Sequence, residues 1–89
     1  MTHKILFYDY VENAVEKRAP FREAHLALTK QWRDDGKLQL GGAIGDPPHG
    51  GVLVFSADAD VEAFTRADPY VREGIVTGFR VEPWNEVVS

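Results

Sequence analysis

Two short stretches of the chain are apolar on both sides of an extended backbone. Residues 4–11 read KILFYDYV, and residues 52–56 read VLVFS. Successive side chains of a strand point to opposite faces, so a half-exposed strand alternates between apolar and polar residues. Neither stretch alternates in that way, because apolar residues occupy most positions of both sets. The pattern therefore predicts two strands in the middle of a sheet that is covered on both faces.

A helical pattern separates these two strands. Apolar side chains recur there at spacings of three and four residues, as in a helix with one buried face, at Phe21, Ala24, Leu28 and Trp32. Pro20 is tolerated in the first turn of a helix, and Gly36 suits the left-handed position just after a helix end. We therefore expect a helix over residues 19–35. A polar connection at 12–20, with room for one turn of helix, precedes it.

The rest of the chain predicts two more strands and two more helical segments. A short strand, a loop rich in turn residues and a last strand follow at residues 37–44, 45–51 and 75–82. A second helix runs through ADVEAFTRA, capped by Asp58 or Ser56 and ended by Pro69. Asp68 can cap a further short turn, PYVREG, which has proline at its first position and glycine after its end.

The order of elements is β-α-β-β-α-β, the ferredoxin-like split βαβ pattern of an α+β fold with an antiparallel sheet. That topology places the first and third strands at the centre of the sheet, and these are the two with apolar residues on both faces. Its helices cover one face only. The simplest cover for the other apolar face is the sheet of a second, identical subunit. We predict a homodimer with face-to-face sheets, a dimeric α/β barrel.

Composition narrows the class of protein. The chain has 89 residues, which suits a single domain spanning 1–89, and no cysteine for a disulfide or a thiolate metal site. We expect neither a signal peptide nor a membrane span, which makes a cytoplasmic location the default. The net charge of −4 disfavours nucleic-acid binding, which needs a basic face. No phosphate-binding, dinucleotide-binding or metal-ligand spacing occurs, so we expect no cofactor and no metal.

His25 is the first candidate for chemistry. At about 100° per residue, it lies at the edge of the buried face of its helix, with Arg22 and Arg18 on the flank beside it. A partly buried imidazole needs a hydrogen-bond partner. Spacing alone leaves two interpretations open: a histidine at the edge of the core that bonds a backbone carbonyl, or a histidine that faces a site.

Asp68 supplies a partner for that imidazole. In a β-α-β-β-α-β sandwich the two helices lie side by side, so the end of the second can approach the middle of the first. A carboxylate fixes the tautomer of an adjacent imidazole, which suits a general acid or base. A simple helix cap is the alternative for Asp68, and the two roles are compatible because a carboxylate has two oxygens.

His49 is a further candidate, in a loop that is either solvated or folded over a cleft.

The longer pattern resembles a known family. Residues 21–44 and 52–84 resemble the YciI-like, or YCII-related, domain. Three motifs carry the resemblance: R-x-x-H-L from Arg22 to Leu26, D-G-K-L before the second strand, and D-P-Y from Asp68 to Tyr70. Their order and spacing agree over nearly the whole chain, which makes the combination more specific than any one motif.

The resemblance implies a dimeric ferredoxin-like barrel whose members use a His–Asp pair in a cleft. That pair would be His25 and Asp68 as catalytic residues, with Arg22 orienting an anionic group, and we add Tyr70 and His49 as candidate substrate-binding residues. Some family members act in the breakdown of substituted, including chlorinated, aromatics. The fold is shared with muconolactone isomerases and small monooxygenases. The loop that contains His49 departs most from the family pattern.

Three functions fit these features. A small cofactor-independent enzyme would use His25 as a general acid or base, in an isomerisation, elimination or hydrolysis-type step on an aromatic or lactone-like metabolite. A non-catalytic binding module would use the same cleft to sense or carry a small molecule. A purely structural dimer would satisfy His25 internally. The enzyme is the leading hypothesis.

Overall fold

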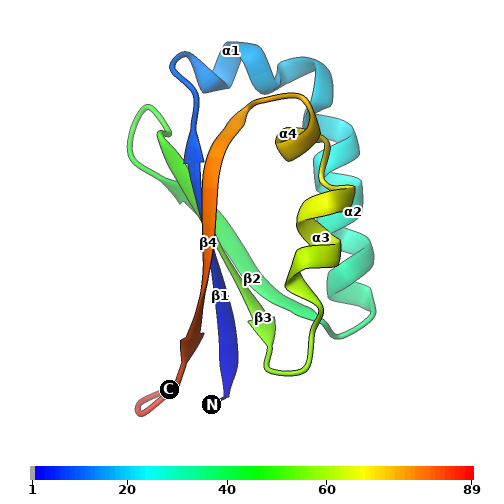
Figure 1. The fold of residues 1–89 in the computed structure, drawn as a ribbon, viewed down its shortest axis with the longest axis vertical. Coiled ribbons are helices and arrows are strands. Elements are labelled where there is room, and N and C mark those ends of the chain that lie inside the picture. Colours follow the sequence, from blue (N-terminus) through cyan, green and yellow to red (C-terminus); the bar gives the residue numbers. More distant parts are fainter. Residues whose placement is uncertain (1) are drawn as a thin grey trace.

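The structure is a computed structural model that describes residues 2–89. Its elements follow in the order β1 (His3–Tyr10), α1 (Ala14–Arg18), the 3₁₀ helix η1 (Ala19–Phe21), α2 (Arg22–Asp34), β2 (Leu38–Ile44), β3 (Gly50–Ser56), α3 (Val61–Ala67), α4 (Pro69–Arg72) and β4 (Val76–Trp84). The strands form one antiparallel sheet in the order β2-β3-β1-β4, and the helices lie on one side of it (Figure 1). This is the predicted α+β ferredoxin-like fold.

The two central strands, β1 and β3, are apolar on both faces, as their sequences predicted. Leu6 pairs with Leu53, and both side chains are buried on the side of the sheet that the helices cover. One position along, Ile5 pairs with Val54 on the opposite face. Two neighbouring strands that alternate in register produce one apolar face for the helices and a second apolar face behind them.

An aromatic cluster fixes α2 and α3 over the sheet. The rings of Trp32, Phe55 and Phe64 meet edge to face, with centroids 5.1 to 5.9 Å apart. Such pairs contribute about 0.5–1.5 kcal/mol each beyond the area they bury. Because Trp32 lies near the C-terminal end of α2, the cluster anchors that end of the helix against β3 and α3.

The helical region begins earlier than its apolar periodicity predicted. It starts at Ala14 with α1, passes through the 3₁₀ turn η1 and continues as α2. The turn contains Pro20, which lacks the N–H that a continuous α-helix would need. At the other end, Gly36 has a φ of 76°, the left-handed conformation predicted for the residue after the helix.

The inner face of α2 is turned slightly from the predicted one. Ala24 was expected in the core but is exposed, whereas His25 is the buried residue of the helix. Leu28 and Trp32 are half-buried against the core, as expected. The helix therefore presents the edge that carries His25 to the sheet, because its largest anchoring side chain, Trp32, lies about 20° from His25 and about 80° from Ala24 around the helix axis.

The two C-terminal helices begin at aspartates. Asp60 caps α3, its side chain accepting the N–H of Ala63 at 3.1 Å, so the predicted caps Asp58 and Ser56 are wrong. The Ser56 hydroxyl instead donates to the Asp58 carboxylate within the preceding turn. Asp68 caps α4, as predicted. In residues 2–89, no helix is long and apolar enough to cross a membrane.

Candidate functional site

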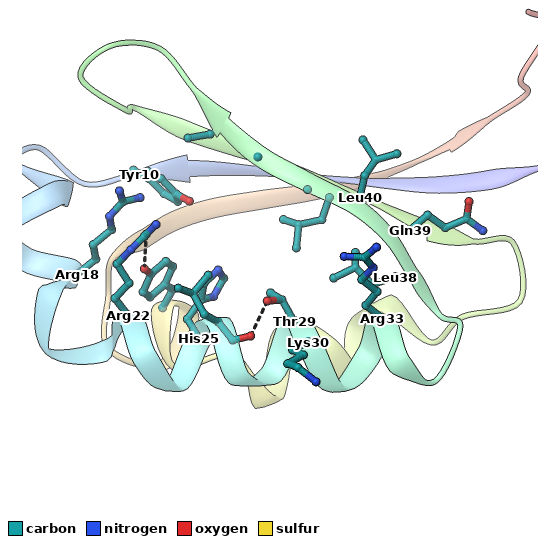
Figure 2. A pocket seen from close by; sticks show the side chains of 16 residues that line it. Tyr10, Arg18, Arg22, His25, Thr29, Lys30, Arg33, Leu38, Gln39 and Leu40 are labelled. Carbon is teal, nitrogen blue, oxygen red and sulfur yellow. Dashed lines mark hydrogen bonds between the residues drawn. The ribbon is translucent and has the colours of Figure 1, made fainter. Parts of the chain in front are cut away.

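A cavity of about 620 Å³ opens between α2 and the edge strand β2 (Figure 2). Its volume lies in the range of pockets that bind small molecules. Side chains of α2 at intervals of three and four residues form one wall, and β2 forms the opposite wall. The aromatic cluster holds the C-terminal end of α2 against β3, and β2 lies beyond β3 as the edge strand of the sheet.

His25 and Asp68 form a buried pair at one end of this cleft. Nδ1 of His25 lies 2.8 Å from Oδ1 of Asp68. The histidine is 8% exposed and the aspartate 0%. A buried carboxylate accepts hydrogen bonds, so Nδ1 carries the hydrogen and Nε2 is left with its lone pair. Nε2 is on the side of the ring away from Asp68, and the ring lines the cleft.

Asp68 is fully enclosed by hydrogen-bond donors. Oδ2 accepts from the Tyr8 hydroxyl at 2.7 Å, and Oδ1 accepts the backbone N–H of Tyr70 at 3.0 Å as well as the imidazole. Burial raises the pKa of Tyr8, and the neighbouring Asp68 charge raises it further. Tyr8 therefore remains protonated and donates its hydrogen bond to the buried carboxylate.

The ring of Tyr70 stacks on one face of the His25 imidazole. The two rings are parallel to within 5°, with centroids 3.8 Å apart. The rings of Tyr10 and Tyr70 are perpendicular, with centroids 6.3 Å apart. Nη1 of Arg22 lies 3.4 Å from the Tyr70 hydroxyl. His25 is thus fixed in its plane by Asp68 and above its plane by Tyr70, so the ring has one orientation.

The cleft is positively charged although the chain is acidic. Its lining includes no aspartate or glutamate but four basic residues, Arg18, Arg22, Lys30 and Arg33. The ammonium group of Lys30 points away and pairs with Asp34, so the charge within the cleft comes from the three arginines. The whole chain has a net charge of −4. A concave surface lined by one sign of charge attracts ligands of the opposite sign. The cleft is therefore suited to an anionic ligand.

Arg18 brings its charge to the His25 end of the cleft. Its Nε is buried and has no hydrogen-bond partner within the described chain. Burial raises the pKa of the neighbouring Tyr10, and the positive charge of Arg18 opposes that rise. A buried donor without a partner is costly, so a ligand that accepts a hydrogen bond here would relieve that cost.

The cleft gathers most of the residues that the sequence singled out, but not all. His25, Arg22 and Tyr70 line it, and Asp68 lies directly behind His25. His49 is not among the lining residues. Its backbone N–H donates to the Ile44 carbonyl and its carbonyl accepts from Tyr10. Its ring fills the space that a side chain on Gly45 would occupy, so His49 packs within its own loop.

Sequence reasoning missed two residues of the site. Arg33 follows Arg22 by eleven residues, which is close to three full turns, so helical spacing could have placed both on one side of the helix. Tyr8 had no such signal, because alternation assigns it only to the inner side of β1. In the part of the chain that the structure describes, no three His, Cys, Asp or Glu side chains are grouped to hold a metal ion.

Comparison with other sequences gives a consistent set of relatives. The chain matches the model of the YCII-related domain over residues 1–85. It is similar to an uncharacterized protein of Haemophilus influenzae, with 32% identity over 94 residues that cover 93% of this chain and 96% of the relative. It is also similar to protein YciI of Escherichia coli, with 30% identity over 86 residues that cover 84% of this chain and 88% of that protein.

Comparison with solved structures finds the same fold in an enzyme. This is 5-chloro-2-hydroxyhydroquinone dehydrochlorinase (TftG) from Burkholderia phenoliruptrix AC1100, in complex with 2,5-dihydroxybenzoquinone. The two structures superpose with a TM-score of 0.77 and 22% sequence identity, and the match covers 93% of each chain. At this identity the likeness shows a shared fold.

Proposed function

Because the chain belongs to the YCII-related domain family, we propose that the cleft is the active site of a cofactor-independent enzyme that transfers a proton on a small molecule. His25 is the general acid or base, Asp68 orients it, and Arg22 holds an anionic group of the substrate. One observation carries the proposal: Nδ1 of His25 lies 2.8 Å from a fully buried carboxylate while its ring lines the cleft. Tyr70 contributes by stacking on the imidazole.

The geometry supports proton transfer at Nε2. The Asp68 carboxylate holds the hydrogen on Nδ1, so the Nε2 lone pair can accept a proton from the substrate. The imidazolium that forms is stabilised by the negative charge of Asp68. In an elimination, the electron pair released forms a new double bond while the leaving group departs with its own pair. In an isomerisation, the imidazolium returns the proton to another substrate atom.

The nature of TftG suggests which compounds to test first. That enzyme is named for removal of hydrogen chloride from a chlorinated hydroxyhydroquinone. We infer that chlorinated hydroquinones are reasonable test substrates here, and lactones are the second class. Loss of hydrogen chloride needs a base for one proton and an exit for chloride, and His25 supplies the base.

The test compares His25 with a histidine outside the cleft. Chloride release from chlorinated hydroquinones and isomerisation of lactones are measured for the wild type, His25→Gln and His3→Gln. We expect His25→Gln to lower kcat about 10²–10⁴-fold, the usual contribution of a general acid or base, and His3→Gln to leave it unchanged. Equal turnover by His25→Gln and the wild type would exclude the proposed role. A compound that binds to the wild type but is turned over by none of the three proteins would support the binding module instead.

We further propose that the protein is a homodimer joined through the outer face of its sheet. The outer face, the side opposite the helices, carries Ile5, Phe7, Leu40, Val52 and Val54. Leu40 is 66% exposed in the single chain. An apolar sheet face of this kind is usually covered, and a face that pairs with its own copy forms a closed dimer.

A further inference from the structure

The cleft continues well past His25, and its far end is charged. Arg33 lies eight residues after His25 on α2, which corresponds to about 12 Å along the helix axis. Both residues line the same cavity. A single aromatic ring in contact with His25 is shorter than that distance and leaves the Arg33 end empty.

Arg33 points into the cleft with its charge unpaired. Figure 2 shows its side chain rising from α2 toward β2, close to Leu38. Lys30, one turn earlier, points away from the cleft and pairs with Asp34 at 2.9 Å. Within residues 2–89, Arg33 takes part in no ion pair. It therefore offers a free guanidinium at the end of the cleft opposite the His25–Asp68 pair.

On the side of the sheet, the stretch between the two ends is apolar. Leu38 of β2 and Leu53 of β3 lie on the inner side of the sheet, and Gly41 of β2 lies beside Leu53. Gly41 pairs with Leu53, so a side chain at position 41 would project into the cleft. Its absence leaves a smooth floor that an alkyl or aryl spacer can cover.

We propose that the cleft binds an elongated amphipathic carboxylate. Its reactive head lies against His25, an apolar spacer crosses Gly41 and Leu53, and its carboxylate pairs with Arg33. The planar fork of a guanidinium matches the two oxygens of a carboxylate. The head-group position rests on the proposed function, whereas the far subsite and the carboxylate go beyond it and define a class of substrate.

The experiment uses two probes that differ only in charge. One is a hydroquinone with a straight chain of about six methylenes ending in a carboxylate, a length that spans the ~12 Å from His25 to Arg33. The other is the matching primary amide. Calorimetry measures both affinities for the wild type, Arg33→Gln and Arg72→Gln, which removes an exposed charge from α4, outside the cleft. The series is repeated with His25→Ala, so binding is read without turnover.

We expect the wild type to bind the acid about tenfold more tightly than the amide at low salt, with the difference shrinking as salt rises. Arg33→Gln should remove that difference and leave amide binding unchanged, while Arg72→Gln alters neither. Equal binding of acid and amide by the wild type would overturn the proposal. An Arg33→Gln variant that still prefers the acid to the amide would also overturn it. If that variant loses stability without a change in binding, the role of Arg33 is to stabilise the C-terminal end of α2. Failure of proton transfer with the carboxylate preference intact would count against the proposed function only.

Discussion

At the scale of single residues, Asp68 has both a structural and a proposed chemical role in the site. Its two oxygens accept from the Tyr8 hydroxyl, the His25 imidazole and the Tyr70 N–H. Three donors around one buried carboxylate offset much of the cost of removing the charge from water. Each partner can be altered separately, and each change has its own expected effect on stability or activity.

Removal of the Tyr8 hydroxyl should lower stability. Tyr8→Phe leaves Oδ2 of Asp68 buried without that donor, and an unsatisfied buried acceptor costs about 1–3 kcal/mol. Tyr70→Phe is the matched control, because within residues 2–89 the Tyr70 hydroxyl takes part in a single, long hydrogen bond, 3.4 Å from Nη1 of the exposed Arg22. Urea unfolding should give a clearly smaller loss for Tyr70→Phe. Equal losses for the two variants would contradict the assigned importance of the Tyr8 contact.

The same contact should give stability a dependence on alkaline pH. Burial and the Asp68 charge raise the pKa of Tyr8 in the folded protein above the value of about 10 expected in the unfolded chain. The contribution of Tyr8 to stability is thus complete below about pH 10 and falls as the pH rises further. The difference in free energy of unfolding between wild type and Tyr8→Phe should shrink above pH 10. A difference that grows with pH would contradict this assignment.

The charge of Asp68 can be separated from its role as a helix cap. Asp68→Asn keeps an oxygen that can accept the N–H of Tyr70 but removes the negative charge beside His25. We expect kcat on an identified substrate to fall about 10²–10⁴-fold. The expected loss of stability is smaller than that of Asp68→Ala, which also removes the cap. Full activity of Asp68→Asn would show that the carboxylate does not support the imidazolium.

At the scale of elements, α2 and β2 contribute different features to the cleft. The helix provides the charged and titratable side chains, and the strand provides a floor without large side chains at Gly41. The φ of Gly41 is not positive, so the backbone there does not require glycine. Space for a ligand is one reason for a residue that weakens a strand, and the register shift between Leu38 and Leu40 beside it is another.

Gly41→Val should therefore change stability and binding in opposite directions. A β-branched residue favours the strand by up to about 1 kcal/mol. A Cβ at position 41 would meet Leu53 at 3.4 Å, so the new side chain fits by filling the cleft. We expect the free energy of unfolding to be unchanged or higher, and affinity for the elongated carboxylate probe to fall about tenfold. Gly41→Ala, which adds one methyl group, is the control; unchanged affinity in Gly41→Val would contradict the position of the spacer.

The elements were more predictable than their contacts. Alternation assigned the faces of β1, and periodicity located α2 and the buried edge with His25, because these depend on local backbone geometry. The cap of α3 was mispredicted because Ser56 and Asp58 bond each other. Helical spacing could place Arg22 beside His25, and topology could suggest Asp68. The contact of Tyr8 with Asp68 joins residues 60 apart in sequence, so it follows from the packed fold and no local pattern encodes it.

At the scale of the whole molecule, the two faces of the sheet carry different features. The inner face carries the core and the cleft, and the outer face carries exposed apolar side chains such as Leu40. Figure 2 shows Leu40 on the side of β2 away from α2. A partner subunit on the outer face would leave the face that bears the His25–Asp68 pair to the ligand.

A charge on the outer face should prevent the proposed dimer. Leu40→Glu replaces a side chain that is 66% exposed in the single chain, so the folded monomer loses little. Light scattering at micromolar concentration should give a dimer for the wild type and a monomer for this variant, because an unpaired carboxylate in an apolar interface is costly. Glu62→Gln, on the exposed side of α3, is the control and should stay dimeric. A wild-type monomer at that concentration would rule the dimer out.

The site is assembled from segments that lie far apart along the chain, and this bears on how the protein folds. Tyr8 comes from β1, His25 from α2 and Asp68 from the junction of α3 and α4, so two of its hydrogen bonds close loops across 60 and 43 residues. Contacts of such separation form after local structure, because the chain entropy must first be lost. We expect the imidazole signal of His25 to reach its native position in the final folding step. The His25 ring, which is proposed to transfer protons, would then also serve as a spectroscopic probe of the last folding step.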